Sequence, residues 1–212
     1  MPERWATFDC YGTLIDWNGG IRRVLADVFG DGRADEQLER YHDVERALEA
    51  DGSLTYREVM TAAMRELGAS EEEAPALADS LPSWEPFPEV RAALTGARDR
   101  GWKLAILSNT DRDLIGASVR QIGVPFECAI VASEIHSYKP ATAHWLRFFE
   151  QTGAPRDGHV HVAQSHVHDI VPASSLGLRT VWINRRGETG DPPPTRELHD
   201  LSELPGTLDE LA

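Results

Sequence analysis

Short apolar runs alternate with helical stretches along most of the chain, and this alternation constrains the fold more than any other feature. Several runs are apolar at consecutive positions, as expected for parallel strands that helices cover on both faces. We expect strands at residues 5–9, 103–109, 128–133, 160–165 and 179–184, and helices at residues 89–101, 111–123, 140–153 and 169–178. The pattern predicts an α/β fold, a Rossmann-like doubly wound parallel sheet that binds its ligand at the carboxyl ends of the strands.

Residues 16–87 interrupt this alternation, because they contain helical stretches and no strand-like run. We expect four helices there, at residues 19–30, 35–50, 55–68 and 70–81. The proline-rich segment 82–90, PSWEPFPEV, is typical of a hinge. The sequence therefore predicts an α/β core domain of residues 1–15 and 88–212 and an inserted helical cap domain of residues 16–87. Since the insertion directly follows the first strand, we favour a lid over the site rather than a bundle that only supports the fold.

Charge and composition exclude several classes of partner. The formal net charge is −14, which disfavours nucleic acid and anionic lipid, and a small anionic substrate would need a few local cations to reverse the field. No stretch approaches the ~20 apolar residues of a membrane span. The two cysteines, Cys10 and Cys128, lie far apart in the sequence, as is typical of free thiols in a reducing compartment. We expect a cytoplasmic protein that binds neither nucleic acid nor a membrane.

Polar side chains stand at the ends of successive predicted strands. Each has an ordinary explanation by itself, such as a helix cap for an aspartate or turn chemistry for Ser-Asn. Their recurrence is informative, because the carboxyl ends of parallel strands meet at one edge of a sheet. The residues are Asp9, Ser108, Asn109, Lys139 and Asp169.

The motifs FDCYGTL, LSNTD, YKP and SHVHDIVPA, taken together, resemble those of the haloacid dehalogenase superfamily. The opening motif is similar to that of the L-specific 2-haloacid dehalogenases. Phosphatases of the superfamily carry a second aspartate two residues after the nucleophile, where this chain has Tyr11, and a tyrosine of pKa ~10 is a poor general acid at neutral pH. Ser165 stands where the phosphatases have a further carboxylate that helps to hold Mg²⁺. The resemblance therefore implies a site without a metal cofactor, and halide, unlike alkoxide, leaves without a proton.

The resemblance implies a covalent mechanism centred on Asp9. Asp9 would displace halide from a short 2-haloalkanoate, and water would then hydrolyse the aspartyl ester to a 2-hydroxy acid. Lys139 would hold Asp9 as an anion or bind the substrate carboxylate, and Asp169 would orient Lys139 and the hydrolytic water. Thr13 and Ser108 would donate hydrogen bonds to carboxylate oxygens, and Asn109 would receive the halide.

Further residues are expected to contact the substrate. Arg40 lies at the family's distance beyond the nucleophile for a halide-binding cap arginine, with a solvent-exposed arginine as the alternative and His42 as a competing contact. We expect Tyr11, Trp17 and Trp145 to form an apolar wall. The fourth motif reads Gln164-Ser165-His166 where the relatives have Ser-Ser-Asn, and His166 would accept or relay a proton of the hydrolytic water.

Other interpretations stay open from the sequence. The His159-Val160-His161 pair would share one face of a strand, and without a third ligand we interpret it as structural rather than metal-binding. A Mg²⁺-dependent phosphatase acting on a small phosphomonoester is the enzymatic alternative. A binding protein without catalytic activity on the same scaffold is the other. By analogy with relatives, a homodimer is expected.

Overall fold

The computed structural model describes residues 3–50 and 52–212 and contains a six-stranded, fully parallel sheet. The strands are β1 (Arg4–Phe8), β2 (Trp102–Ser108), β3 (Cys128–Val131), β4 (His159–Ala163), β5 (Arg179–Ile183) and β6 (Arg196–Leu198). Their order is β3-β2-β1-β4-β5-β6, so the chain crosses from one side of β1 to the other after β3. The predicted doubly wound α/β fold is confirmed. The sequence missed β6 because that strand is three residues long and mostly exposed, and so has no apolar run.

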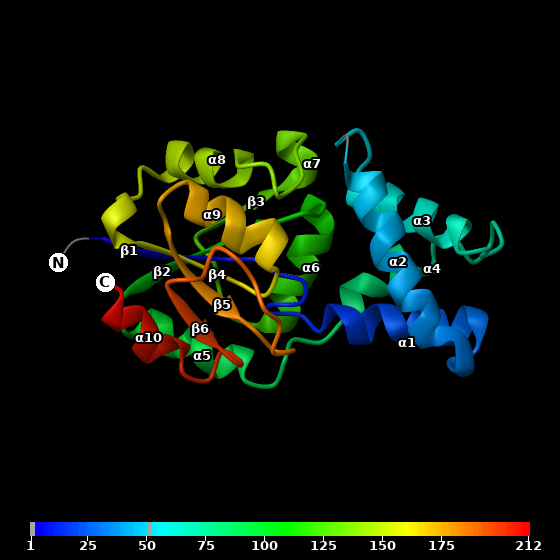
Figure 1. Ribbon diagram of the computed structural model, residues 1–212, viewed down its shortest axis with the longest axis horizontal. Coiled ribbons are helices and arrows are strands. Elements are labelled where there is room, and N and C mark those ends of the chain that lie inside the picture. Colours follow the sequence, from blue (N-terminus) through cyan, green and yellow to red (C-terminus); the bar gives the residue numbers. More distant parts are fainter. Residues whose placement is uncertain (1–2, 51) are drawn as a thin grey trace.

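Side chains of the central strands alternate between two apolar layers. On β2, Leu104 and Ile106 belong to the larger core, whereas Ala105 and Leu107 belong to the smaller one on the other face. This is the period of two expected for a strand. The helices α5 (Val90–Asp99), α6 (Arg112–Ile122) and α10 (Leu204–Glu210) cover one face (Figure 1). The other face is covered by α7 (Ala132–Ile135), α8 (Ala143–Thr152) and α9 (Val171–Ser175).

Helices α1 (Trp17–Phe29), α2 (Ala34–Glu49), α3 (Tyr56–Glu66) and α4 (Ala76–Ser80) lie together beyond the carboxyl end of β1 (Figure 1). They occupy the part of the sequence in which four helices were predicted. The last of them is much shorter than residues 70–81, because Pro75 has no N–H to donate and disfavours helical conformation in the residue before it. None of the helices in the described ranges is long and apolar enough to cross a membrane.

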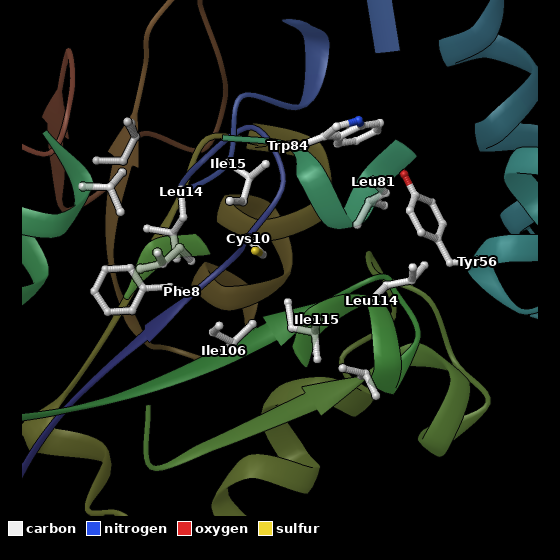
Figure 2. Packing of buried hydrophobic residues seen from close by; sticks show 14 of the residues in the cluster. Phe8, Cys10, Leu14, Ile15, Tyr56, Leu81, Trp84, Ile106, Leu114 and Ile115 are labelled. Atoms are coloured by element: carbon white, nitrogen blue, oxygen red, sulfur yellow. The ribbon is translucent and has the colours of Figure 1, made fainter. Parts of the chain in front are cut away.

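One continuous apolar layer joins these four helices to the sheet. Figure 2 shows the chain leaving β1 at Phe8 and passing Leu14 and Ile15, which lie on the same layer as Trp84 and as Tyr56 from α3. A polar contact fixes the same junction. The carboxylate of Asp111, which follows β2, accepts the backbone N–H groups of Tyr56 at 3.0 Å and Arg57 at 2.9 Å at the start of α3. Those N–H groups have no partner within the helix, so Asp111 holds α3 over the strand ends.

Candidate active site

A cavity of about 260 Å³ lies between the carboxyl ends of the strands and helices α1 to α3. Residues after β1, β2, β3 and β4 form one side, and residues of the helices form the other. The residues of the strand side are Asp9, Tyr11, Ser108, Asn109, Lys139, Gln164, Ser165, His168 and Asp169. Those of the helical side are Trp17, His42, Glu45, Arg46, Glu49 and Tyr56. Arg186 and Glu188 also line the cavity.

Asp9 follows β1 directly, and both of its carboxylate oxygens are held. Oδ1 accepts a hydrogen bond from Lys139 Nζ at 2.8 Å, and Oδ2 accepts one from Thr13 Oγ1 at 2.8 Å. Because Thr13 Oγ1 itself accepts the N–H of Gln164 at 2.8 Å, its own hydrogen is free to point at Asp9. Burial raises the pKa of the Asp9 carboxyl above its ordinary value, while the adjacent ammonium favours the charged form. The arrangement orients a desolvated carboxylate towards the cavity.

Lys139 uses all three of its N–H groups within the protein. Nζ donates to Asp9 Oδ1, to Asp169 Oδ1 at 2.6 Å and to the carbonyl oxygen of Leu107 at 3.0 Å. The side chain is 2% exposed. Burial alone would lower the pKa of Lys139, but the two carboxylates outweigh burial and raise it, so the group stays charged. With its donors occupied, Lys139 is placed to hold the two aspartates rather than to bind a substrate carboxylate.

Asp169 connects this ammonium to the histidine pair of β4. Its Oδ1 accepts from Lys139 and lies 3.0 Å from His161 Nε2, whereas the buried Oδ2 has no hydrogen-bond partner among the described residues. Burial favours the neutral acid, but Lys139 and His161 outweigh it and lower the pKa of Asp169 to about 2. Asp169 is therefore an anion held by Lys139 and His161, and the residue lines the cavity.

The two histidines of the HVH sequence share one face of β4, as expected, and both contact Thr7 of the neighbouring strand. Thr7 Oγ1 lies 2.9 Å from His161 Nδ1 and 2.9 Å from His159 Nε2. Burial lowers the pKa of His159 to about 3, so its ring is neutral. The pair forms a buried hydrogen-bonded row that ends on Asp169. The sequence pattern did not indicate this contact, because the spacing of two residues gives only the shared face.

Ser108 and Asn109, at the end of β2, both line the cavity. Ser108 is 1% exposed, and its hydroxyl group has no hydrogen-bond partner among the described residues. Asn109 links β2 to Lys139, since its Oδ1 accepts the Lys139 N–H at 2.7 Å and its Nδ2 donates to the Lys139 carbonyl oxygen at 3.1 Å. Nδ2 also donates to Glu49 Oε2 at 3.3 Å. Asn109 therefore connects the strand ends with α2.

The fourth motif places His168, and not His166, in the cavity. The expected position of His166 is wrong, because its Nε2 bonds the carbonyl oxygen of Pro192 at 3.0 Å and its ring packs against Trp182. The motif folds as a π-helical turn over His166–Ile170, whereas the sequence predicted a helix only from residue 169 onwards. Ser165 does line the cavity, and its Oγ lies 3.0 Å from His168 Nδ1. Burial lowers the pKa of His168, which favours a neutral ring.

The expected position of Arg40 in the site is also wrong. Arg40 is exposed, and its side chain donates to Gln37 on its own helix at 3.3 Å. The residues of α2 that line the cavity are His42, Glu45, Arg46 and Glu49, spaced as one helical face. At 3.6 residues per turn, Arg40 points roughly 200° away from His42. The number of residues between Asp9 and Arg40 therefore did not show which side of α2 faces the cavity.

The aromatic wall is partly as expected. Tyr11 and Trp17 line the cavity. The Trp17 ring stacks on the His42 ring with ring centres 4.8 Å apart, and Trp17 Nε1 donates a hydrogen bond to the Tyr56 hydroxyl oxygen at 3.1 Å. Burial raises the pKa of Tyr11, so the phenol stays neutral. Trp145 is wrong as a wall residue, because it is fully buried under the sheet and packs on His161 with ring centres 5.0 Å apart. Apolar residues recur at helical spacing along α8, and this pattern is typical of a helix face that packs in the core.

Sequence reasoning missed two acidic residues on the helical side, Glu45 and Glu49. An acidic amphipathic helix gives no signal that separates buried carboxyl groups from the exposed ones beside them. In the described ranges, no three side chains of His, Cys, Asp or Glu converge in a way that could hold a metal ion.

Comparisons with known proteins agree with this fold and these motifs. A model of the haloacid dehalogenase-like hydrolase family matches residues 4–163. Haloacetate dehalogenase H-2 of Moraxella sp. (strain B) is 32% identical over 195 residues, which are 85% of each chain. (S)-2-haloacid dehalogenase 1 of Pseudomonas sp. (strain CBS-3) is 27% identical over 221 residues, covering 98% of this chain and 97% of the relative. The chain belongs to the haloacid dehalogenase-like hydrolases.

A solved structure gives the same result for the fold. The L-2-haloacid dehalogenase from Xanthobacter autotrophicus, with chloropropionic acid covalently bound, matches with a TM-score of 0.86 over 99% of this chain and 100% of the other. The sequence identity is 17%, so this likeness supports the fold alone.

Proposed function

We propose that this protein is a hydrolytic 2-haloacid dehalogenase that converts a short 2-haloalkanoate to a 2-hydroxy acid and halide through an ester on Asp9. The observation that carries the proposal is the buried Asp9 carboxylate, fixed at one oxygen by Lys139 and at the other by Thr13, at the wall of a cavity. The curated relatives named above act on haloacetate and on (S)-2-haloacids. A cavity of about 260 Å³ has room for a short acid of this kind.

In the first step, Asp9 attacks C2 of the substrate and the halide leaves from the opposite side. A carboxylate is a weak nucleophile in bulk water, so its removal from solvent and its fixed direction favour the displacement. We assign the Ser108 hydroxyl group, which has no protein partner in the described ranges, to the substrate carboxylate. Arg46 and Arg186 line the same cavity and supply the positive charge that an anionic substrate needs in a chain of net charge −14.

In the second step, water attacks the carbonyl carbon of the ester. Asp169 Oδ2 orients that water, because Lys139 and His161 hold the other oxygen of the same carboxylate. The low pKa of Asp169 makes it an acceptor of hydrogen bonds rather than a base. We assign proton removal to the neutral ring of His168, which takes the place that the sequence had suggested for His166.

We further propose that residues 16–87 act as a cap domain whose helices exclude water from Asp9. Glu49 and Tyr56 bring α2 and α3 onto the strand ends through Asn109 and Asp111. A cytoplasmic location and a homodimer stay predictions from the sequence, to be tested by cell fractionation and light scattering.

The test is release of halide from L-2-chloropropionate and from chloro-, bromo- and fluoroacetate in the presence of EDTA. We expect turnover in the wild type and a loss of at least about 10³-fold in Asp9→Asn with the fold retained by circular dichroism. One turnover in ¹⁸O-water should label the Asp9 side chain, detected by mass spectrometry. A folded enzyme that releases no halide and instead cleaves p-nitrophenyl phosphate when Mg²⁺ is added would contradict the proposal.

A further inference from the structure

A buried row of hydrogen-bonding side chains runs from the middle of the sheet to the active site. The proposed mechanism uses His161 only as a contact of Asp169 and gives Thr7 and His159 no role. Thr7 Oγ1 lies 2.9 Å from His159 Nε2 and 2.9 Å from His161 Nδ1. His161 Nε2 lies 3.0 Å from Asp169 Oδ1, and none of the four residues is more than 1% exposed. Burial of so many polar groups is unfavourable unless each finds a partner, so the row requires an explanation.

The positions of the hydrogens follow from the two ends of this row. Asp169 is an anion and can only accept, so His161 carries its hydrogen at Nε2 and donates it to Oδ1. His161 Nδ1 is then an acceptor, and it takes the single hydroxyl hydrogen of Thr7. Thr7 Oγ1 in turn accepts a hydrogen bond from His159 Nε2, whose ring is neutral because burial lowers its pKa to about 3.

The opposite direction would leave a buried donor without a partner. If Thr7 gave its hydrogen to His159 Nε2, the hydrogen of the neutral His159 ring would lie at Nδ1, which has no hydrogen-bond partner among the described residues. Buried N–H groups without a partner are unfavourable and rare in proteins. In the first direction, every N–H and O–H group of the row donates a hydrogen bond. The row therefore points towards Asp169.

The His161 ring is held from several sides. Thr7 lies directly opposite His161 in the register of β1 and β4, and Trp145 packs against the imidazole with ring centres 5.0 Å apart and an angle of 76° between the planes. Lys139, the other donor to Asp169 Oδ1, has a flexible four-carbon side chain and an ammonium group that rotates. The packed imidazole, rather than the ammonium, therefore fixes the direction from which Oδ1 is held.

This contact controls which way the Asp169 carboxylate faces. An aspartate carboxylate turns readily about its bond to Cβ, because that torsion has broad, roughly two-fold energy wells. Two donors hold Oδ1, and Oδ2 has no partner among the described residues, so the two oxygens are not equivalent. We propose that His161, oriented by Thr7, is a positioning residue that fixes the rotation of the Asp169 carboxylate for the water that hydrolyses the ester. His159 completes the row, since its N–H directs the hydroxyl hydrogen of Thr7 towards His161.

The inference rests on the proposed function and assigns the row to its second step. The first step does not need the row, because Lys139 and Thr13 hold the Asp9 carboxylate through bonds that do not involve the histidines. The second step needs a water in one place, and a misplacement of about 1 Å can slow a reaction about 10²-fold. No proton moves along the row, which acts only by hydrogen bonding.

The first test separates the two steps within a single turnover. His161→Leu removes both ring nitrogens, whereas His161→Gln keeps an N–H group that can reach Asp169. We expect His161→Leu to slow ester hydrolysis about 10²-fold, so that the Asp9 ester accumulates, and to change halide release in the first turnover by less than about threefold. His161→Gln should hydrolyse the ester at least about tenfold faster than His161→Leu. Rapid quenching followed by mass spectrometry measures the ester.

A matched control separates positioning from a general loss of stability. Leu178 is buried in the same apolar layer as Trp145 and forms none of the hydrogen bonds of the row, so Leu178→Ala should lose stability and hydrolyse the ester at the wild-type rate. The solvent isotope effect on ester hydrolysis should keep its wild-type value in His161→Leu, because His168 still removes the proton. Equal slowing of both steps, an unchanged rate of ester hydrolysis, no recovery in His161→Gln or a reduced isotope effect would overturn the inference.

A second test uses the wild-type protein and does not depend on turnover. In protein labelled with ¹⁵N-histidine, NMR spectra report which ring nitrogens carry hydrogen, and His161→Gln identifies the signals of His161. At pH 7 we expect hydrogen at Nε2 alone in both His159 and His161. Hydrogen at Nδ1 of His161 would overturn the inference. If no haloacid is turned over, the proposed function fails and the role in ester hydrolysis fails with it, whereas the expected spectrum would still establish the ordered row.

Discussion

The two sides of the cavity differ in whether their carboxyl groups have a cation as a partner. On the strand side, one ammonium, Lys139, is shared by two carboxylates, and both stay within 2.8 Å of it. On the helical side, the buried Glu45 accepts hydrogen bonds from two tyrosines, and the half-buried Glu49 accepts one from the Asn109 amide. Asp169 is therefore held as an anion, whereas a pKa of about 9 favours the neutral acid at Glu49. The comparison teaches that burial alone raises the pKa of a carboxyl group, and that a cation buried with the carboxyl group opposes this increase.

Removing the shared cation should have the largest effect on this contrast. In Lys139→Met, Asp9 and Asp169 would be left buried without a counter-ion, so we expect about 3–5 kcal/mol less free energy of unfolding and a loss of turnover of at least about 10³-fold. Urea unfolding and halide release measure the two effects. The other lysine of the chain, Lys103, is exposed, and Lys103→Met should change stability by less than about 0.5 kcal/mol. Similar behaviour of the two variants would show that the cation does not organise the strand side.

The next effect concerns the two histidines of the fourth motif. We expect His168→Asn to slow ester hydrolysis by about 10²-fold, because the water loses its proton acceptor, and to leave halide release in the first turnover unchanged. The Asp9 ester should then accumulate and be detected by mass spectrometry. His166→Asn, which changes a residue outside the cavity, should show neither effect. Accumulation of ester in the His166 variant alone would reverse this assignment.

The pH dependence of stability should differ in sign between Asp169 and the two glutamates of the helical side. The pKa of Asp169 lies at about 2, below its ordinary 3.8, so its stabilising contribution is present above pH 4 and is lost as the pH falls through 2. The pKa values of Glu45 and Glu49 are raised from 4.5 to about 7 and about 9, so their contribution is present below pH 4.5 and is lost as the pH rises through these values.

Urea unfolding at pH 5, 7 and 9 checks the helical side. We expect the free energy of unfolding to fall less between pH 5 and 9 in Glu49→Gln than in the wild type, and the exposed control Glu39→Gln to follow the wild type. Parallel curves for all three proteins would contradict the raised pKa assigned to Glu49.

The smallest effects should come from the arginines of α2. Arg40→Ala is expected to change turnover by less than about twofold and stability by less than about 0.5 kcal/mol, because its side chain is exposed and away from the cavity. Arg46→Ala should raise KM for the anionic substrate several-fold with little change in kcat, since Arg46 lines the cavity. Steady-state kinetics at low salt compare the two. A larger loss in the Arg40 variant would restore the prediction made from the sequence.

The sequence by itself determined the parallel α/β sheet, the position of the helical insertion and the strand-side residues. Asp9, Ser108, Asn109, Lys139 and Asp169 follow strands whose carboxyl ends must meet, so their place along the chain settles their place in space. The same physics accounts for the shared face of His159 and His161 on β4.

Only the tertiary structure decided which faces of α2 and of the fourth motif point into the cavity. The rotation of a helix about its axis depends on packing against other elements, and one α-helical period does not distinguish Arg40 from His42 or Glu49. The fourth motif forms a π-helical turn, in which His168 lines the cavity and His166 does not. The raised pKa values of Glu45 and Glu49 likewise follow from desolvation, which arises only when α2 and α3 close over the strand ends.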